Sequence, residues 1–215
     1  MKKAISVIIL ISLIGILFSC AAQSPSATTL AGVEVKQYQG KNLSSMNDII
    51  DNAIVGTQKI DVNTYHLEIS GMVNTPQQLT YDQVLSLTHY KKVVTLNCVE
   101  GWSADILWEG VLLKDVMDKA GIQSGANTVI FTCSDGYTTS LPLDYIVNNQ
   151  IILASKMNDV VIPQEKGFPF MVVAENKLGY KWAKWITKIE LSNDPSYLGY
   201  WESNGYSNDA DVQAS

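Results

Sequence analysis

One cysteine lies where a predicted strand meets a loop, a position suited to chemistry. Val93–Leu96 is an apolar, β-branched run that predicts a buried strand, Cys98 follows it, and Gly101 then breaks the pattern. We therefore expect the thiol at a junction between a fixed scaffold and an exposed loop. Two structural roles stay open for it: a small core hydrophobe, or one half of a disulfide.

A second cysteine, Cys133, has a similar setting. The run Thr128–Cys133 predicts another strand, and Cys133 ends it much as Cys98 ends the first. Two strand-end thiols could be neighbours, so in an oxidising compartment they are a candidate disulfide. The sequence leaves open whether they are joined.

The charges of the chain limit its partners. The net charge is −6, and all 15 basic residues are lysines, with no arginine anywhere. Nucleic-acid binding needs clustered cations that neutralise phosphates, and no basic stripe occurs in this sequence. We therefore expect no nucleic-acid partner.

Several motifs, in a fixed order, resemble one enzyme family. They are TYHLEISG from Thr64, TLNCVEGWS from Thr95, WEGVLL from Trp108, SDGY from Ser134, GYKWAKWI from Gly179 and GYWE from Gly199. This set resembles the molybdopterin-binding domain of the sulfite oxidase family, whose bacterial branch includes the catalytic subunit of periplasmic methionine sulfoxide reductase. The resemblance implies one α+β domain at residues 37–212, with mixed β-sheets and short helices, and an oxidoreductase that uses a molybdenum–molybdopterin cofactor.

The resemblance also implies roles for single residues. A deprotonated thiol is a soft ligand that suits molybdenum held by dithiolene sulfurs, and by resemblance Cys98 is that ligand. In the family a Gly-aromatic-Lys-x-x-Lys stretch meets the phosphate end of the cofactor, and here Lys184 stands at the second lysine, after Trp182 and Ala183. Lys181 is a weaker candidate, because it can equally be a solvated residue at a strand edge.

One stretch departs from the methionine sulfoxide reductase branch. Where that branch has Asn-Gly-x-Pro-x-Arg, this chain has Lys166 in place of Asn and Met171 in place of Arg, so Lys166 is a candidate replacement cation. A Thr near the cofactor in that branch aligns with Cys133, or with Thr132 if the register shifts by one. Asn52 is the candidate for an upstream polar contact.

The start of the chain predicts an exported lipoprotein. A basic start and an apolar run lead to LFSC, a lipobox-like motif that ends at Cys20, so residues 1–19 are the predicted signal peptide and Cys20 the lipid-attachment residue. An ordinary cleaved signal peptide is the alternative. Residues 20–36 are predicted to be a flexible linker, and the domain is expected outside the cell membrane, anchored to it. No twin-arginine export motif is present, which leaves open how a cofactor is inserted.

Short strands and brief helices are expected to position these residues. Further strands are predicted at Thr64–Ser70, Tyr137–Leu141, Ile151–Ala154, Phe170–Val173 and Ile186–Leu191, and short helices after Thr80, at Leu112–Ala120 and at Pro142–Val147. Thr80 and Gln83 fit a capping box. Alternation in the last strand puts Ile186 and Ile189 on opposite faces. Strands and helices do not alternate regularly, which favours an α+β domain.

Two functional hypotheses follow. The first is a lipid-anchored molybdopterin oxidoreductase that acts on a small sulfoxide or N-oxide and uses a membrane or soluble electron-transfer partner. Sulfite is disfavoured because the arginine fork that binds oxyanions through two parallel hydrogen bonds is missing. Trp102 and Trp108 favour a neutral substrate if they line the mouth of the site, and either can equally be core. The second hypothesis is a cofactor-free lipoprotein that keeps the fold as a binding or structural module.

Overall fold

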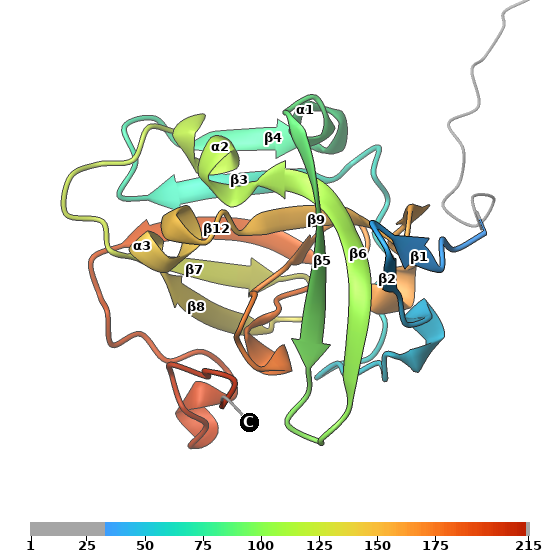
Figure 1. Cartoon of the computed structure of the whole chain (residues 1–215). Helices are drawn as coiled ribbons and strands as arrows, with labels where there is room; N and C mark the ends of the chain where they lie inside the picture. The colour runs from blue at the N-terminus through green and yellow to red at the C-terminus, as the bar shows by residue number, and fades with distance from the viewer. Residues whose placement is uncertain (1–32, 214–215) are drawn as a thin grey trace, which may run out of the picture.

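Two five-stranded sheets form the framework of residues 33–213, the part of the chain that this computed structural model describes (Figure 1). One sheet contains β5 (His89–Asn97), β6 (Ser103–Leu112), β9 (Ile152–Met157), β10 (Val160–Val161) and β11 (Met171–Val172), in the order β10-β9-β6-β5 with β11 beside β9. The other contains β3 (His66–Gly71), β4 (Gln77–Thr80), β7 (Thr128–Cys133), β8 (Thr138–Pro142) and β12 (Ile186–Ser192), in the order β4-β3-β12-β7-β8. Because β12 pairs in parallel with β3 and antiparallel with β7, this sheet is mixed, as predicted.

Short helices and one small hairpin complete the framework. They are β1 (Gln37–Tyr38), β2 (Lys41–Asn42), α1 (Tyr81–Leu85), α2 (Leu113–Asp118), α3 (Leu143–Asn148) and the 3-10 helices η2 (Met46–Asp48), η3 (Gln164–Lys166), η4 (Gly179–Lys181) and η5 (Glu202–Asn204). The predicted capping box opens α1: Thr80 Oγ1 accepts from the Gln83 amide at 3.2 Å, and Gln83 Oε1 accepts from the Thr80 amide at 2.9 Å. Within residues 33–213, no helix has the length and apolar character needed to cross a membrane.

A long β5–β6 hairpin carries the cysteine loop. The two strands pair from His89 opposite Val111 to Asn97 opposite Ser103, and in Figure 1 the hairpin runs across the strands of the other sheet. The Cys98 amide donates to the Trp102 carbonyl at 2.9 Å and closes the loop. The predicted strand-to-loop junction at Cys98 is confirmed, whereas the ten-residue length of β6 was not predicted.

The last strand departs from simple alternation. Ile186 and Ile189 are both fully buried, although alternation predicts that they face opposite sides. A register irregularity between Ile186 and Lys188, in the pairing with β7, shifts the side-chain phase by one residue. The predicted opposition of Ile186 and Ile189 is therefore wrong, because it assumes an unbroken ladder.

Contacts of the domain begin before residue 37. The Glu34 carboxylate accepts hydrogen bonds from Ser45 Oγ at 2.9 Å and from the Met46 amide at 2.8 Å. Asn158 Nδ2 also donates to Glu34, at 2.9 Å, and the Asn158 carbonyl accepts from the Val35 amide at 3.1 Å. The last residues of the predicted linker are thus bound to the domain. The predicted signal peptide and Cys20 lie outside the described residues.

Candidate functional site

A cavity of about 480 Å³ opens beside the β5–β6 loop. Its walls come from stretches far apart in the sequence, within residues 49–54, 96–102, 179–184 and 200–206. Five of the residues singled out from the sequence line it together, namely Cys98, Lys184, Lys166, Trp182 and Asn52. Cys133 and Ala183 are not among the lining residues.

The hairpin and the η4 segment together position Cys98. Cys98 is half-buried and its thiol is free. A parallel bridge joins Asn97 to Leu178, the residue just before η4. A Cβ added at Gly179 would sit 3.8 Å from the Cys98 Cα, so the backbone of the GYKWAKW motif lies against the cysteine loop. Two motifs about 80 residues apart in the sequence therefore form one wall of the cavity.

Lys184 supplies a cation with unused donors. Its ammonium makes one long hydrogen bond, 3.4 Å to the Glu165 carbonyl, and lies 4.3 Å from the centroid of the Trp185 ring. Burial lowers the pKa of Lys184, and the carboxylates of Asp51 and Asp135 oppose that shift. An ammonium has three donors, so Lys184 can still bind an anion in the cavity.

Gly167 permits this placement of Lys184. Gly167 has φ of +121°, a conformation that L side chains rarely adopt, and a Cβ there would lie 2.6 Å from the Lys184 Cβ. Its carbonyl accepts a hydrogen bond from the Trp185 amide at 3.3 Å. Gly167 lies in the stretch that differs from the methionine sulfoxide reductase branch. Because it has no side chain, Lys184 can pack closely against the end of η3.

Lys166 has a different task from Lys184, although both line the cavity. Its buried ammonium donates to the Ile49 carbonyl at 2.6 Å and to Asp51 Oδ2 at 2.9 Å. These bonds hold the stretch that continues into Asn52, whose side chain is exposed at the cavity. Lys166 thus fixes a wall, and its charge is already paired.

Lys181 is not a solvated residue at a strand edge, so that alternative for it is wrong. It has no exposed surface, and its ammonium is 2.5 Å from Glu202 Oε1. It also donates to the Ser140 carbonyl at 3.0 Å and to Asn208 Oδ1 at 2.9 Å. The side chain is fully used in the interior and does not line the cavity.

Cys133 and Ala183 lie in the interior, behind the cavity wall. Cys133 is 3% exposed. Burial raises the pKa of its thiol, and the nearby carboxylate of Asp135 adds to this. Ala183 is 1% exposed, and its carbonyl accepts from the Val172 amide at 2.8 Å. Both thiols of residues 33–213 are free.

Tryptophans and tyrosines form much of the cavity surface. Trp108 is fully buried and its ring centroid lies 5.5 Å from that of Trp182, so it is core that forms the cavity floor. Trp102 is half-buried in the cysteine loop. Five aromatic residues were missed as site residues: Tyr137, Tyr180, Tyr200, Trp201 and Tyr206. The signal that could have found them is their place inside the SDGY, GYKWAKWI and GYWE motifs or just after them.

The donor set of the cavity fits a cofactor that brings its own metal ligands and a phosphate. A soft thiol on one wall suits molybdenum, and an ammonium with free donors suits the phosphate. Residues 33–213 contain no group of three or more His, Cys, Asp or Glu side chains that could hold a metal ion.

Comparison with known proteins gives the same assignment. The model of the "oxidoreductase molybdopterin binding domain" family matches residues 54–201. The uncharacterized oxidoreductase YuiH of Bacillus subtilis is 34% identical over 147 residues, which are 68% of this chain and 74% of that protein. The putative protein-methionine-sulfoxide reductase subunit YedZ1 of Azospira oryzae is 34% identical over 150 residues, 69% of this chain and 56% of that protein.

A solved structure shows the same fold. The sulfane dehydrogenase SoxCD of Paracoccus pantotrophus matches with a TM-score of 0.62 at 19% identity, over 65% of this chain and 41% of that chain. The chain thus spans about half the length of two of these proteins. The predicted α+β fold is confirmed. With its family model covering residues 54–201, this chain belongs to the oxidoreductase molybdopterin binding domain family, as the resemblance to the sulfite oxidase family predicted, and its cofactor is molybdenum–molybdopterin.

Proposed function

We propose that this protein is a lipid-anchored, extracytoplasmic oxidoreductase that removes oxygen from a small neutral sulfoxide or N-oxide. The observation that carries the proposal is that Cys98 and Lys184 line one cavity. The bound cofactor supplies the two-electron oxygen-atom transfer. The protein supplies the position of the cofactor, the position of the substrate and the exclusion of water.

Each cavity residue has a task in this proposal. Cys98 ligates molybdenum as a thiolate, and Lys184 neutralises the pterin phosphate. Gly179 lets the backbone of its segment approach the cofactor closely. Lys166 holds the wall on which Asn52 makes a polar contact.

The proposed substrate follows from the charged residues of the chain and from the side chains that line the cavity. The chain has no arginine, so it lacks the planar fork that holds a dianion such as sulfite. The cavity lining includes several aromatic rings, which suit a neutral substrate. The similarity to a putative protein-methionine-sulfoxide reductase subunit agrees with a sulfoxide. Removing one sulfoxide oxygen as water consumes two electrons and two protons, so the proposal includes an electron-donor partner.

Elemental analysis and kinetics test this function. Protein purified from its native host is expected to hold about one molybdenum per chain and to reduce sulfoxides with much higher kcat/KM than it oxidises sulfite. A kcat/KM for sulfite of about 10⁴ M⁻¹s⁻¹ or more would show that arginine is dispensable and that the substrate argument fails. Folded protein without molybdenum would favour the cofactor-free lipoprotein instead.

The proposed anchor has its own test. Cys20→Ser removes the only thiol of the lipobox-like motif and is expected to move the protein from the membrane fraction to the soluble fraction. Ser19→Ala is the matched control, since it leaves that thiol in place. Firm membrane binding by the Cys20→Ser variant would contradict lipid attachment.

A further inference from the structure

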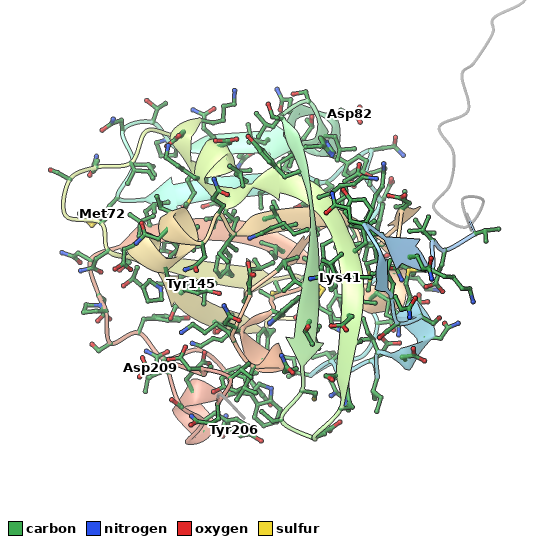
Figure 2. The ribbon with its side chains drawn as sticks, in the orientation of Figure 1. Lys41, Met72, Asp82, Tyr145, Tyr206 and Asp209 are labelled. Atoms are coloured by element: carbon green, nitrogen blue, oxygen red, sulfur yellow. The ribbon has the colours of Figure 1, made fainter. Side chains whose placement is uncertain are left out.

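Five aromatic residues form a continuous surface along the cavity, here named the aromatic wall: Tyr137, Tyr180, Tyr200, Trp201 and Tyr206. The ring centroids are 5.9 Å apart for Tyr137 and Tyr200, 5.2 Å for Tyr200 and Trp201, 5.1 Å for Trp201 and Tyr206, and 5.3 Å for Tyr206 and Tyr180. Each ring therefore packs on the next. Figure 2 labels Tyr206 at the C-terminal segment, near the loop that joins β5 and β6.

The aromatic wall reaches the protein surface. Tyr200, Trp201 and Tyr206 are 40%, 37% and 39% exposed, although each also lines the cavity. Two further exposed apolar residues, Ile50 and Val99, line the same cavity from other segments. Exposed apolar side chains that gather at one opening mark a binding surface. Cys98 lines the same cavity.

A buried ion pair lies directly behind the aromatic wall. Lys181 follows Tyr180 and Glu202 follows Trp201, so each member is the sequence neighbour of a wall residue. The two side chains are 2.5 Å apart and almost completely buried. Thr139 Oγ1 also donates to Glu202 Oε1, at 2.6 Å. The pair joins η4, which contains Tyr180, to η5, which lies between Trp201 and Tyr206 in the sequence.

Stability alone is a weak reason for such a pair. Two charges lose their hydration on burial, and apolar residues of similar volume often give equal or greater stability. Burial indeed lowers the pKa of Lys181, although the Glu202 carboxylate opposes that shift. Glu202 Oε2 has no hydrogen-bond partner among the described residues, so the network is not fully satisfied. The ion pair instead fixes the relative position of the segments, because the Lys181 ammonium donates to three acceptors on three different segments.

We propose that Lys181 and Glu202 are positioning residues: their ion pair fixes the aromatic wall at the cavity mouth, and the wall selects substrates whose oxidised sulfur or nitrogen carries an aromatic or large apolar group. The inference rests on the proposed function for the reaction itself. Substrate rings gain contact with the wall only when its rings keep their mutual packing. The pair therefore acts on substrate choice without touching the substrate.

Binding of two sulfones tests the inference, because a sulfone resembles a sulfoxide in shape and polarity. Full-length protein from its native host is titrated calorimetrically with methyl phenyl sulfone and with dimethyl sulfone. We expect tighter binding of the phenyl compound. Trp201→Ala, Lys181→Met and Glu202→Gln should each weaken phenyl sulfone binding by about three- to tenfold and change dimethyl sulfone binding little.

Lys177→Met is the matched control for the pair. Lys177 is also nearly buried and pairs with Asp211, so it joins the same two parts of the chain, but it does not line the cavity or neighbour a wall residue. We expect unchanged preference between the sulfones. The double variant Lys181→Met/Glu202→Leu separates position from stability, since apolar replacement can restore stability without the directed contacts. A double variant with wild-type melting temperature and wild-type sulfone preference would overturn the positioning role.

Other outcomes also bear on the inference. Equal affinity for the two sulfones in the wild-type protein, or no measurable affinity for either, would overturn the selective role of the wall. Trp201→Ala keeps the test valid if the pair variants fold poorly, because Trp201 lies at the surface. Failure of the proposed function is seen separately, as absence of molybdenum or of sulfoxide turnover. Sulfoxide turnover without phenyl preference would contradict only the selective role of the aromatic wall.

Discussion

Two cysteines and two lysines differ in where the fold places them: Cys98 and Lys184 line the cavity, whereas Cys133 and Lys181 lie in the interior behind it. In the cavity, Cys98 is half-buried and Lys184 keeps unused donors. In the interior, Cys133 is 3% exposed and Lys181 has a carboxylate and further acceptors around its ammonium. The comparison teaches that the residue type does not decide which thiol and which lysine can act on a ligand. Their partners decide it.

The sheets explain the difference between the two thiols. β5 is the edge strand of its sheet and ends in an open hairpin loop, so Cys98 faces the cavity. β7 lies between β12 and β8, so the end of this strand is covered on both sides. Burial then raises the pKa of Cys133. A buried thiol of this kind is unreactive, whereas one at the cavity can become a thiolate ligand.

The largest expected effect comes from Cys98→Ser. Loss of a supporting residue around a metal costs about 10- to 100-fold in activity or affinity, so loss of the proposed ligand itself should cost more than about 100-fold in the proposed sulfoxide reduction. Turnover assays with parallel molybdenum analysis measure this. A Cys98→Ser protein with near wild-type kcat would remove the distinction between the two thiols.

Lys181→Met should produce the largest loss of stability. Removing one partner of a buried ion pair leaves Glu202 unpaired, and we expect the free energy of unfolding to fall by about 3–5 kcal/mol. Urea unfolding followed by circular dichroism measures the change. Lys184→Met is the paired control and should change stability little, because burial already disfavours the Lys184 cation. Equal losses of unfolding free energy in the two variants would show that Lys181 and Lys184 contribute equally to stability, against the prediction.

Lys184→Met should instead weaken cofactor retention. A hydrogen bond from a charged donor contributes about 1.5–3 kcal/mol, which corresponds to roughly 10- to 100-fold in affinity for the pterin phosphate. Molybdenum content after extensive dialysis checks this prediction. Lys184→Arg keeps the charge and should retain most of the metal. Full retention by the Met variant would show that Lys184 does not hold the phosphate.

Cys133→Ala should have the smallest effect. It removes one buried sulfur, for which we expect a stability loss of about 1 kcal/mol, while Cys98 keeps its place and turnover stays close to that of the wild type. Thermal unfolding and the sulfoxide assay check both parts. A turnover loss as large as that of Cys98→Ser would show that Cys133 also acts in the cavity.

The sequence by itself determined the features that depend on local order. The strand predicted at Thr64–Ser70 corresponds to β3, and the Thr80–Gln83 capping box predicted the start of α1. The apolar run before Cys98 predicted the strand-to-loop junction. Ordered motifs also pointed to the family and so to the α+β fold. Each of these signals is contained within a few neighbouring residues, so the rest of the chain was not needed to recognise it.

Only the tertiary structure decided which of the similar residues face the cavity. Lys181 finds its partner Glu202 21 residues away, and no local pattern distinguishes it from Lys184 three residues later. The irregular pairing of β12 with β7 buried Ile186 against the expected alternation. The aromatic wall exists because η5 packs beside η4. The burial of a side chain and its hydrogen-bond partners depend on which distant segments pack against it. Those contacts cannot be read from a single sequence.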